Sequence, residues 1–292
     1  MQTNLRKFWN KFNELGPSGS LFWGRELLFS WNLPKQERQG RAGSGTSLSD
    51  ADEFISICKA AYQNDQIFER FRRNRQYRTI LEHVTWKQGK KYQACIKNLE
   101  LYSQIFPALR RQGKVGGPFR YRYKPIGYIS PTQLRYLKVL DDLHNMYGSL
   151  SGFKIGEIGI GFGGQAAVIL SFYDDLKYHF YDLPEVLDLA SKFLSVSNVV
   201  ASPTKNDGRS PIPTRFDLVI SNYAFSELSR KVQDLYIENV LSETKHAYIT
   251  WNELSHSKLD GYSLDKILEL FPLARLIDEV PLTAPGNTII YW

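Results

Sequence analysis

The sequence predicts an α/β fold, in which a doubly wound, mostly parallel seven-stranded sheet follows an N-terminal helical segment. From about residue 130 onward, short apolar runs alternate with amphipathic helical stretches, which is typical of parallel strands covered by helices on both faces. A glycine-rich turn follows the first run, as expected where a strand leads into a ligand-binding helix. The last two runs can pair only as antiparallel neighbours, because a parallel crossover needs about a dozen residues.

The helix that precedes the sheet has the clearest start signal. Ser130 can cap it, Pro131 supplies the fixed φ of a first turn, and Gln133 can close a capping box. The expected strands are Lys154–Ile158, Lys177–Tyr181, Asn198–Ala201, Phe216–Ser221, His246–Trp251, Arg275–Val280 and Thr288–Tyr291. The expected helices between them are Gln165–Phe172, Pro184–Leu194, Ser229–Leu241 and Ser263–Phe271.

Composition divides the chain into three segments. Residues 1–46 mix aromatics with Gly, Pro and Gln and end in a glycine-rich stretch, so we expect a poorly defined segment and linker. Residues 47–128 carry apolar positions at helical spacing, up to a loop-like stretch from Gly113 to Tyr128, and predict a helical lid or substrate domain. Residues 129–292 form the expected α/β domain.

The bulk composition excludes several classes of protein. With 42% hydrophobic and 14% aromatic residues, the chain can bury a large core, which excludes wholesale disorder. It contains neither an apolar run as long as a membrane span nor the pattern of a signal peptide. Cys58 and Cys95 belong to no C-x-x-C or Cys/His cluster, so we expect no metal ligands and no disulfide framework. These features predict a cytoplasmic protein, and nothing in them indicates its oligomeric state.

Charge is distributed unevenly along the chain. Residues 1–125 contain 23 Lys and Arg against 10 Asp and Glu, whereas residues 126–292 contain 14 against 20. One interpretation is a set of solvated basic helix faces, which is the usual role of charge runs. The other is a surface for an anionic partner, such as a phosphorylated glycan carrier, a membrane surface or nucleic acid. Because no nucleic-acid-binding module is recognisable, nucleic acid is the less favoured partner.

The glycine-rich turn predicts the binding site. Gly159, Gly161 and Gly164 let the backbone turn tightly after the first strand and let a ligand approach it, while the next helix directs its N–H groups at that ligand. Asp182 ends the second strand, where a carboxylate can accept hydrogen bonds from ribose hydroxyls. A strand, a glycine turn, a helix and a second strand with a terminal acid therefore indicate an adenosine-containing ligand.

The glycine spacing leaves two adenosine cofactors open. Gly159-x-Gly161-x-x-Gly164 also satisfies the dinucleotide fingerprint, so NAD competes. Glu157, two residues before the first glycine, matches the E-x-G-x-G-x-G loop of class I methyltransferases, and so does the expected C-terminal antiparallel hairpin. We therefore favour S-adenosylmethionine.

Three segments of the chain resemble the sugar O-methyltransferase family. They are residues 157–165, Tyr181 to Val186, and Phe216 to Leu228; the similarity spans about residues 115–260 and extends back through residues 77–84. The resemblance implies a class I, Rossmann-like fold and methylation of a sugar or glycan hydroxyl, on an acceptor that can be nucleotide- or lipid-linked. The chain has Gly116-Gly117-Pro118 where Gly-Asn-Pro is expected, which removes one polar group near the cleft.

Methyl transfer to a hydroxyl needs in-line positioning and usually a base. In this topology the substrate approaches over the carboxyl ends of the fourth and fifth strands. Glu227 and His256 are the candidate bases, with a helix N-terminal carboxylate and an exposed loop residue as their respective alternatives. The expected cofactor-binding residues are Glu157, Gly159, Gly161, Gly163, Gln165, Asp182 and Asn222. The expected substrate-binding residues are Tyr223, Asn252 and Tyr123.

Two other functions compete with a methyltransferase. An NAD-dependent oxidoreductase or epimerase would fit the glycine spacing, but no Tyr-x-x-x-Lys pair follows a strand in the matching place. A nucleic-acid-binding protein would use the basic N-terminal half, and its affinity would fall steeply with salt.

Overall fold

The computed structural model describes residues 52–292, apart from 200–202, 209–210, 212 and 254–258. The expected N-terminal linker and the candidate base His256 lie outside the described residues. Among the helices that are described, none combines the length and the hydrophobicity needed to cross a membrane.

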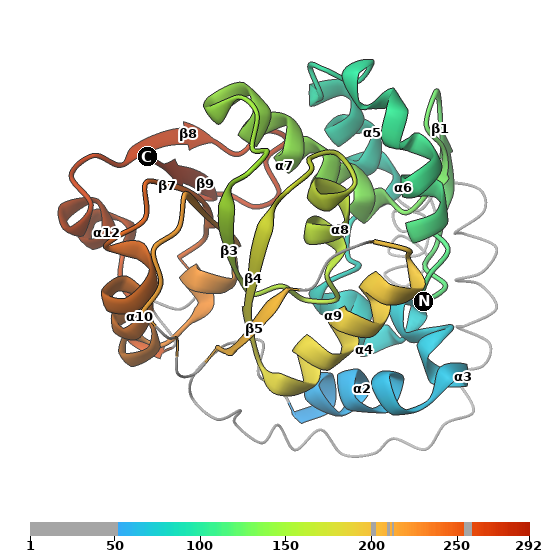
Figure 1. The fold of residues 1–292 in the computed structure, drawn as a ribbon, viewed down its shortest axis with the longest axis horizontal. Helices are drawn as coiled ribbons and strands as arrows, with labels where there is room; N and C mark the ends of the chain where they lie inside the picture. The colour runs from blue at the N-terminus through green and yellow to red at the C-terminus, as the bar shows by residue number, and fades with distance from the viewer. Residues whose placement is uncertain (1–51, 200–202, 209–210, 212, 254–258) are drawn as a thin grey trace, which may run out of the picture.

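The centre of the molecule is a seven-stranded sheet with the order β5-β4-β3-β6-β7-β9-β8 (Figure 1). Its strands are β3 (Lys154–Ile158), β4 (Lys177–Asp182), β5 (Thr204–Asp207), β6 (Leu218–Asn222), β7 (His246–Trp251), β8 (Arg275–Asp278) and β9 (Thr288–Tyr291). The first five pair in parallel, and β9 lies antiparallel between β7 and β8. The predicted fold class is therefore confirmed.

Helices cover both faces of the sheet because its strands are apolar on both sides. In β6, Leu218 and Ile220 join one hydrophobic core, whereas Val219 between them joins the other. The first core also contains α7 (Pro131–Tyr147), α8 (Gly164–Leu170) and α9 (Pro184–Val196), and the second contains α10 (Arg230–Tyr236), η4 (Ile237–Leu241) and α12 (Leu264–Leu270). This two-sided burial is what a parallel sheet requires.

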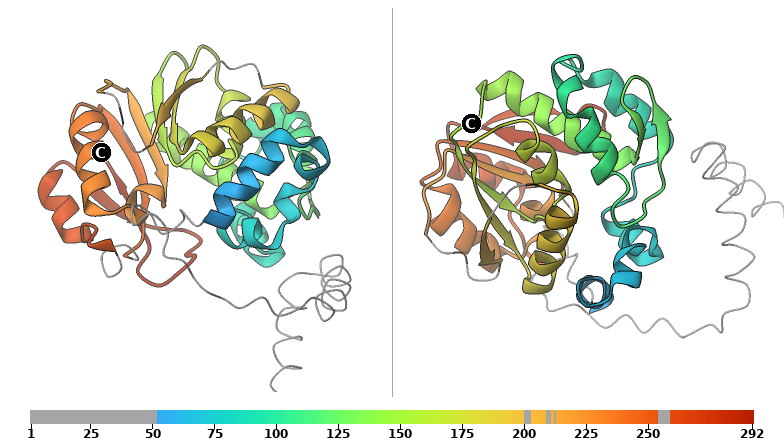
Figure 2. Two further views of the ribbon diagram at one scale, coloured as in Figure 1. Left: turned by 90° about the horizontal axis from the view of Figure 1, so that it is seen from below. Right: turned by 45° about the vertical axis from the view of Figure 1, so that its right-hand side comes forward.

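The N-terminal helices pack beside the sheet rather than apart from it. They are α2 (Asp52–Gln63), α3 (Asp65–Phe68), η1 (Phe71–Arg73), α4 (Arg75–Ile80), α5 (Trp86–Cys95), η2 (Leu101–Ile105) and α6 (Phe106–Gln112). Figure 2 shows these blue to teal helices grouped against α7 and α9, away from β8 and β9. Their apolar residues belong to the same core as those of α7, α8 and α9, so the helical segment and this face of the sheet are one packed unit.

Several predicted elements agree with the structure and others need correction. The capping box at Ser130 is present, with the Gln133 side chain accepting from the Ser130 N–H at 3.2 Å. The strand expected at Asn198–Ala201 does not begin there, since Asn198 and Val199 are outside any strand and β5 begins at Thr204; the rest of the expected strand lies outside the described residues. The stretch expected to be a loop contains an antiparallel pair, β1 (Tyr121–Tyr123) and β2 (Gly127–Ile129), because its apolar side chains alternate and one face packs inward.

Candidate active site

The glycine turn is held open by its backbone geometry. Gly159 and Gly161 have φ values of +79° and +55°, which side chains other than glycine rarely adopt. A Cβ on Gly159 would lie 2.1 Å from the Cβ of Ala224, which follows β6. The chain after β3 therefore passes directly against the chain after β6, and both carboxyl ends border one cavity.

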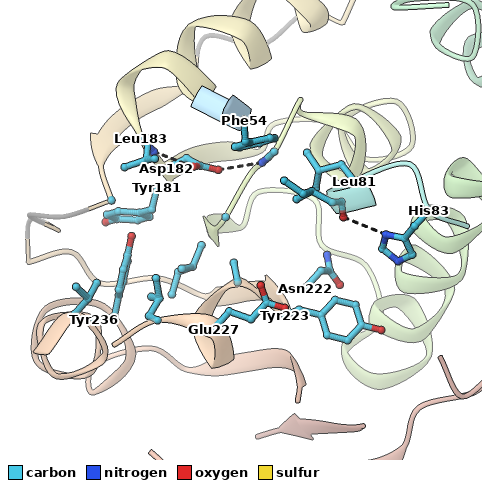
Figure 3. A pocket seen from close by; sticks show the side chains of 18 of the residues that line it. Phe54, Leu81, His83, Tyr181, Asp182, Leu183, Asn222, Tyr223, Glu227 and Tyr236 are labelled. Carbon is cyan, nitrogen blue, oxygen red and sulfur yellow. Dashed lines mark hydrogen bonds between the residues drawn. The ribbon is translucent and has the colours of Figure 1, made fainter. Parts of the chain in front are cut away.

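Asp182 ends β4 beside this turn. Its Oδ2 accepts from the N–H of Gly161 at 3.1 Å, and its Oδ1 accepts from the N–H of Leu183 at 2.8 Å. These two bonds fix the carboxylate at the mouth of the turn, as Figure 3 shows. A fixed carboxylate with lone pairs toward a cavity can accept hydrogen bonds from a pair of hydroxyls.

A single cavity joins these groups to the helical segment. Its volume is about 180 Å³, counted as space for the centres of water molecules. The end near Asp182 is walled by Leu183, Tyr181 and Tyr236. Leu228 and Val232 add further apolar lining to the cavity. The helical segment closes the cavity with Phe54, Ile80, Leu81 and His83. The cavity therefore has one apolar end and, around His83, one polar end.

The polar end is built where β6 finishes. Asn222 and Tyr223 both line the cavity, and the chain turns sharply at Tyr223, whose φ is +70°. The Tyr223 hydroxyl donates to the buried carboxylate of Glu279 and lies 2.8 Å from the Thr283 hydroxyl. Burial raises the pKa of Tyr223, so this side chain is a neutral hydrogen-bonding group at neutral pH.

Glu227 also lines the cavity, as the sequence led us to expect. Its Oε1 accepts from the side-chain amide of Asn252 at 2.9 Å. Asn252 is buried and does not itself line the cavity. The structure therefore places Asn252 behind Glu227, where it orients the carboxylate, rather than at the expected substrate position.

His83 is a cavity residue that the sequence analysis did not identify. Its Nδ1 lies 3.1 Å from the Ile80 carbonyl oxygen, so Nδ1 carries the proton and Nε2 is left as an acceptor. His83 is exposed to solvent and also lines the cavity. Desolvation by the surrounding chain, together with the charge of Arg135, lowers the pKa of His83 from 6.5 to about 4. His83 is therefore neutral at physiological pH, and its Nε2 carries no proton.

A buried ion pair forms at the residue next to His83 in the sequence. Arg72 lies 2.5 Å from the carboxylate of the adjacent Glu82, and both side chains are inaccessible or nearly so. Arg72 also donates to Ser130 at the start of α7, and its guanidinium lies 4.4 Å from the ring centre of Phe162 in the glycine turn. The pair thus joins the helical segment to both α7 and the glycine turn.

Besides Asn252, four expected site residues do not line the cavity. Gly163 caps α8 beside Leu194, and Gln165 is buried with its amide donating to the Tyr136 carbonyl. Tyr123 is buried in the helical segment, where its hydroxyl donates to the Trp86 carbonyl. The β1–β2 pairing turns Tyr123 inward, so the structure does not bring it to the cavity. The fourth residue is Glu157.

Glu157 is buried in β3 and accepts a hydrogen bond from the Tyr178 hydroxyl at 2.9 Å. Burial raises its pKa to about 8. A carboxyl whose pKa is raised by folding stabilises the protein below its unfolded pKa, and this contribution is lost as pH rises toward the folded value.

We expect Glu157→Gln, which keeps an acceptor for Tyr178, to raise the unfolding midpoint at pH 8.5 and to change it little at pH 5. Each unit of pKa shift corresponds to about 1.4 kcal/mol. Thermal unfolding at the two pH values measures the difference, and an equal effect at both would contradict the assignment.

The comparisons with known proteins give solved structures only. No protein-family model and no curated protein matches this chain. An O-methyltransferase family 2 protein from Planctomyces limnophilus in complex with apigenin is 15% identical, with 51% of this chain and 52% of that chain covered and a TM-score of 0.38. The matched region thus spans about half of the Planctomyces protein.

Two further solved structures are similar over a little more than half of this chain. A SAM-dependent methyltransferase from Aquifex aeolicus is 15% identical over 53% of this chain and 87% of that chain, with a TM-score of 0.40. The magnesium protoporphyrin IX methyltransferase from Synechocystis, solved with bound SAM, is 12% identical over 55% and 77%, with a TM-score of 0.44.

Proposed function

We propose that this protein is an S-adenosylmethionine-dependent O-methyltransferase that acts on a hydroxyl of a sugar or glycan. One observation carries the proposal: the glycine turn and Asp182 border one end of a cavity, His83 lies at the opposite end, and Glu227 lines the cavity between them. A cofactor held at the first end would direct its reactive group toward the second. Binding and proton removal would then occur in one cavity.

The cavity residues fit the parts of this cofactor. Asp182 would accept from the ribose hydroxyls, and the aromatic and apolar wall near Tyr236 offers flat surface for an adenine ring. Glycines at 159 and 161 leave room for the methionine portion along the backbone, and Asn222 offers its side-chain amide there. The cofactor, when bound, supplies an electrophilic methyl group.

The acceptor hydroxyl must be aligned and must lose its proton. We place it between Asn222, Tyr223 and His83, because these residues form the polar end of the cavity. The Nε2 atom of His83 would receive the proton, since Nδ1 already donates to Ile80 and the ring stays neutral at physiological pH. Glu227, the base expected from the sequence, would instead bind or orient a neighbouring hydroxyl.

The sugar part of the proposal has narrower support. It comes from the resemblance of residues 157–165, 181–186 and 216–228 to the sugar O-methyltransferase family. The polar end of the cavity agrees with it, because an acceptor with several hydroxyls needs several hydrogen-bonding side chains.

Asp182→Ala should weaken binding of S-adenosylhomocysteine about ten- to a hundredfold, since a hydrogen bond to a charged group contributes about 1.5–3 kcal/mol. Calorimetric titration measures the affinity, and circular dichroism checks the fold. Asp188→Ala is the matched control, because Asp188 is on the neighbouring helix α9 and pairs with Lys205 at the surface. Equal affinities for the folded Asp182 variant and the wild type would remove Asp182 from the cofactor site.

A further inference from the structure

Arg135 is a buried cation without a partner of opposite charge. It lies near the start of α7, lines the polar end of the cavity and is only 8% exposed. Within the described parts of the chain, no carboxylate lies within 4.0 Å of its guanidinium, and its Nε atom has no hydrogen-bond partner. An arginine keeps its charge even when buried, so the wall of the cavity contains a buried charge with no carboxylate beside it.

The other buried cations of this region are paired. Arg72 meets Glu82, and Lys138, one turn further along α7, meets Asp142. Burying a charge without a partner costs several kcal/mol. The contrast on the same helix therefore needs an explanation specific to the position of Arg135.

The nearest protein groups do not supply the missing counter-charge. Glu279 is the carboxylate to consider, because its charge and that of Arg135 both influence the pKa values of His83 and Tyr223. However, no ion pair joins Glu279 to Arg135 in the described part of the chain, and the Glu279 carboxylate instead accepts hydrogen bonds from Tyr223, Thr283 and Asn287. Tyr136 is a side-chain hydrogen-bond partner of Arg135, and its ring centre lies 5.4 Å from the guanidinium, but a neutral phenol does not neutralise a full charge.

A second buried donor near Arg135 is also unsatisfied. Tyr92 is 3% exposed, and its hydroxyl has no hydrogen-bond partner among the described residues. Arg135 is close enough for its charge to act on Tyr92, Tyr223 and His83. Figure 3 shows His83 and Tyr223 on the side of the cavity opposite Asp182. The unpartnered Nε of Arg135 is therefore assigned to the His83 side of the cavity, whereas Tyr92 does not itself line the cavity.

We propose that Arg135 binds an anionic group, a carboxylate or a phosphate, carried by the methyl acceptor. The proposal rests on the proposed function and names the class of its substrate: an acidic sugar or a sugar phosphate rather than a neutral one. A guanidinium suits either group, because its planar N–H donors match two oxygens at once. Binding would supply the counter-charge and hold the acceptor hydroxyl beside His83.

The test uses the full chain saturated with S-adenosylhomocysteine. Glucuronate, glucose 1-phosphate and methyl glucoside are titrated by calorimetry as the carboxylate, phosphate and neutral probes. We expect at least one anionic probe to bind about tenfold or more tighter than methyl glucoside, in line with hydrogen bonds to a charged group. The anionic probe that binds shows whether the acceptor carries a carboxylate or a phosphate.

Variants then assign that preference to Arg135. Arg135→Gln should abolish the preference for an anionic probe. If the glutamine variant folds poorly, Arg135→Met replaces it in the test, since replacing a buried charge by an apolar side chain is often tolerated. Lys138→Gln is the matched control, because Lys138 is a buried cation on α7 that does not line the cavity, and it should keep the preference. Equal binding of all three probes, no binding of either anion, or an unchanged preference in both Arg135 variants would overturn the proposal.

Two further titrations distinguish binding of the methyl acceptor by Arg135 from binding of the cofactor by Arg135. 5′-Methylthioadenosine lacks the amino-acid portion of S-adenosylhomocysteine. If Arg135→Gln weakens S-adenosylhomocysteine but not methylthioadenosine, Arg135 binds the cofactor's carboxylate and the proposal is overturned. If S-adenosylhomocysteine fails to bind the wild type, the proposed function itself fails. Intact cofactor binding without an anion preference removes only the present inference.

Discussion

Replacing His83 by Gln is expected to lower the rate of methyl transfer about 10²–10⁴-fold, the usual effect of removing a general base. The affinity for S-adenosylhomocysteine should stay nearly unchanged, because His83 lies at the opposite end of the cavity from Asp182. Glutamine keeps hydrogen-bonding groups at this position and loses the basic nitrogen. Single-turnover rates with an accepted substrate measure the effect, and calorimetry measures the affinity.

Glu227→Gln is the control for this prediction, since Glu227 is the other proton acceptor that lines the cavity. Loss of the Glu227 carboxylate should reduce the rate of methyl transfer less than loss of the His83 imidazole. A larger effect at Glu227 would return the base to the residue expected from the sequence. If both variants turn over like the wild type, positioning alone accounts for the rate.

The same assignment predicts an unusual pH profile. The pKa of His83 is lowered from 6.5 to about 4 by burial and by the charge of Arg135, against the opposing influence of Glu279. Protonation would remove the lone pair on Nε2, so activity should be lost only well below the usual histidine range. An ordinary imidazole would instead lose its basic form at about pH 6.5. A fall in rate centred there would contradict the lowered pKa of His83.

Arg72→Met is expected to lower the free energy of unfolding by about 3–5 kcal/mol, as is typical when one partner of a buried ion pair is removed. The change would leave the carboxylate of Glu82 buried without its cation, and would remove the contacts to Ser130 and Phe162. Chemical denaturation measures the loss.

Two further variants test whether the loss of stability comes from burial of the ion pair. Arg215→Met removes an exposed ion pair with Glu243 and should cost less than about 1 kcal/mol. Combining Arg72→Met with Glu82→Gln should recover part of the stability, since no buried charge is then left alone. A loss below about 1 kcal/mol for Arg72→Met alone would show that the pair does not anchor the helical segment.

The fold could be predicted because local patterns determine it. The bounds of β3, β7 and β9 are those expected from the sequence, since each is an apolar run between clear turn signals. The position of β5 differs from the predicted one because the sequence Thr204–Asp207 is polar. The more apolar stretch Asn198–Ala201 resembles a buried strand more closely. The β1–β2 pair was missed because three-residue strands carry little periodicity.

Local patterns also predict part of the candidate site. Gly159, Gly161 and Asp182 were expected from spacing, and they border the cavity because the carboxyl ends of β3 and β4 are neighbours. Asn222, Tyr223 and Glu227 follow β6 and reach the cavity in the same way. The topology of a doubly wound sheet brings all six together.

The residues that were missed come from outside the sheet. His83 and Arg135 reach the cavity only because the helical segment and α7 pack against the glycine turn, which no local pattern encodes. The one available signal was the position of His83 within residues 77–84, where the family resemblance extends. Gln165, in contrast, occupies the expected first turn of α8 but points inward to Tyr136.

The central claim is that the cavity between the glycine turn and His83 binds S-adenosylmethionine. Its most direct test is a calorimetric titration of the full chain with S-adenosylmethionine, S-adenosylhomocysteine and NAD under the same conditions. The account predicts one site per chain for the two sulfur-containing nucleosides and no measurable binding of NAD. Saturable binding of NAD with no binding of either of the others would contradict it.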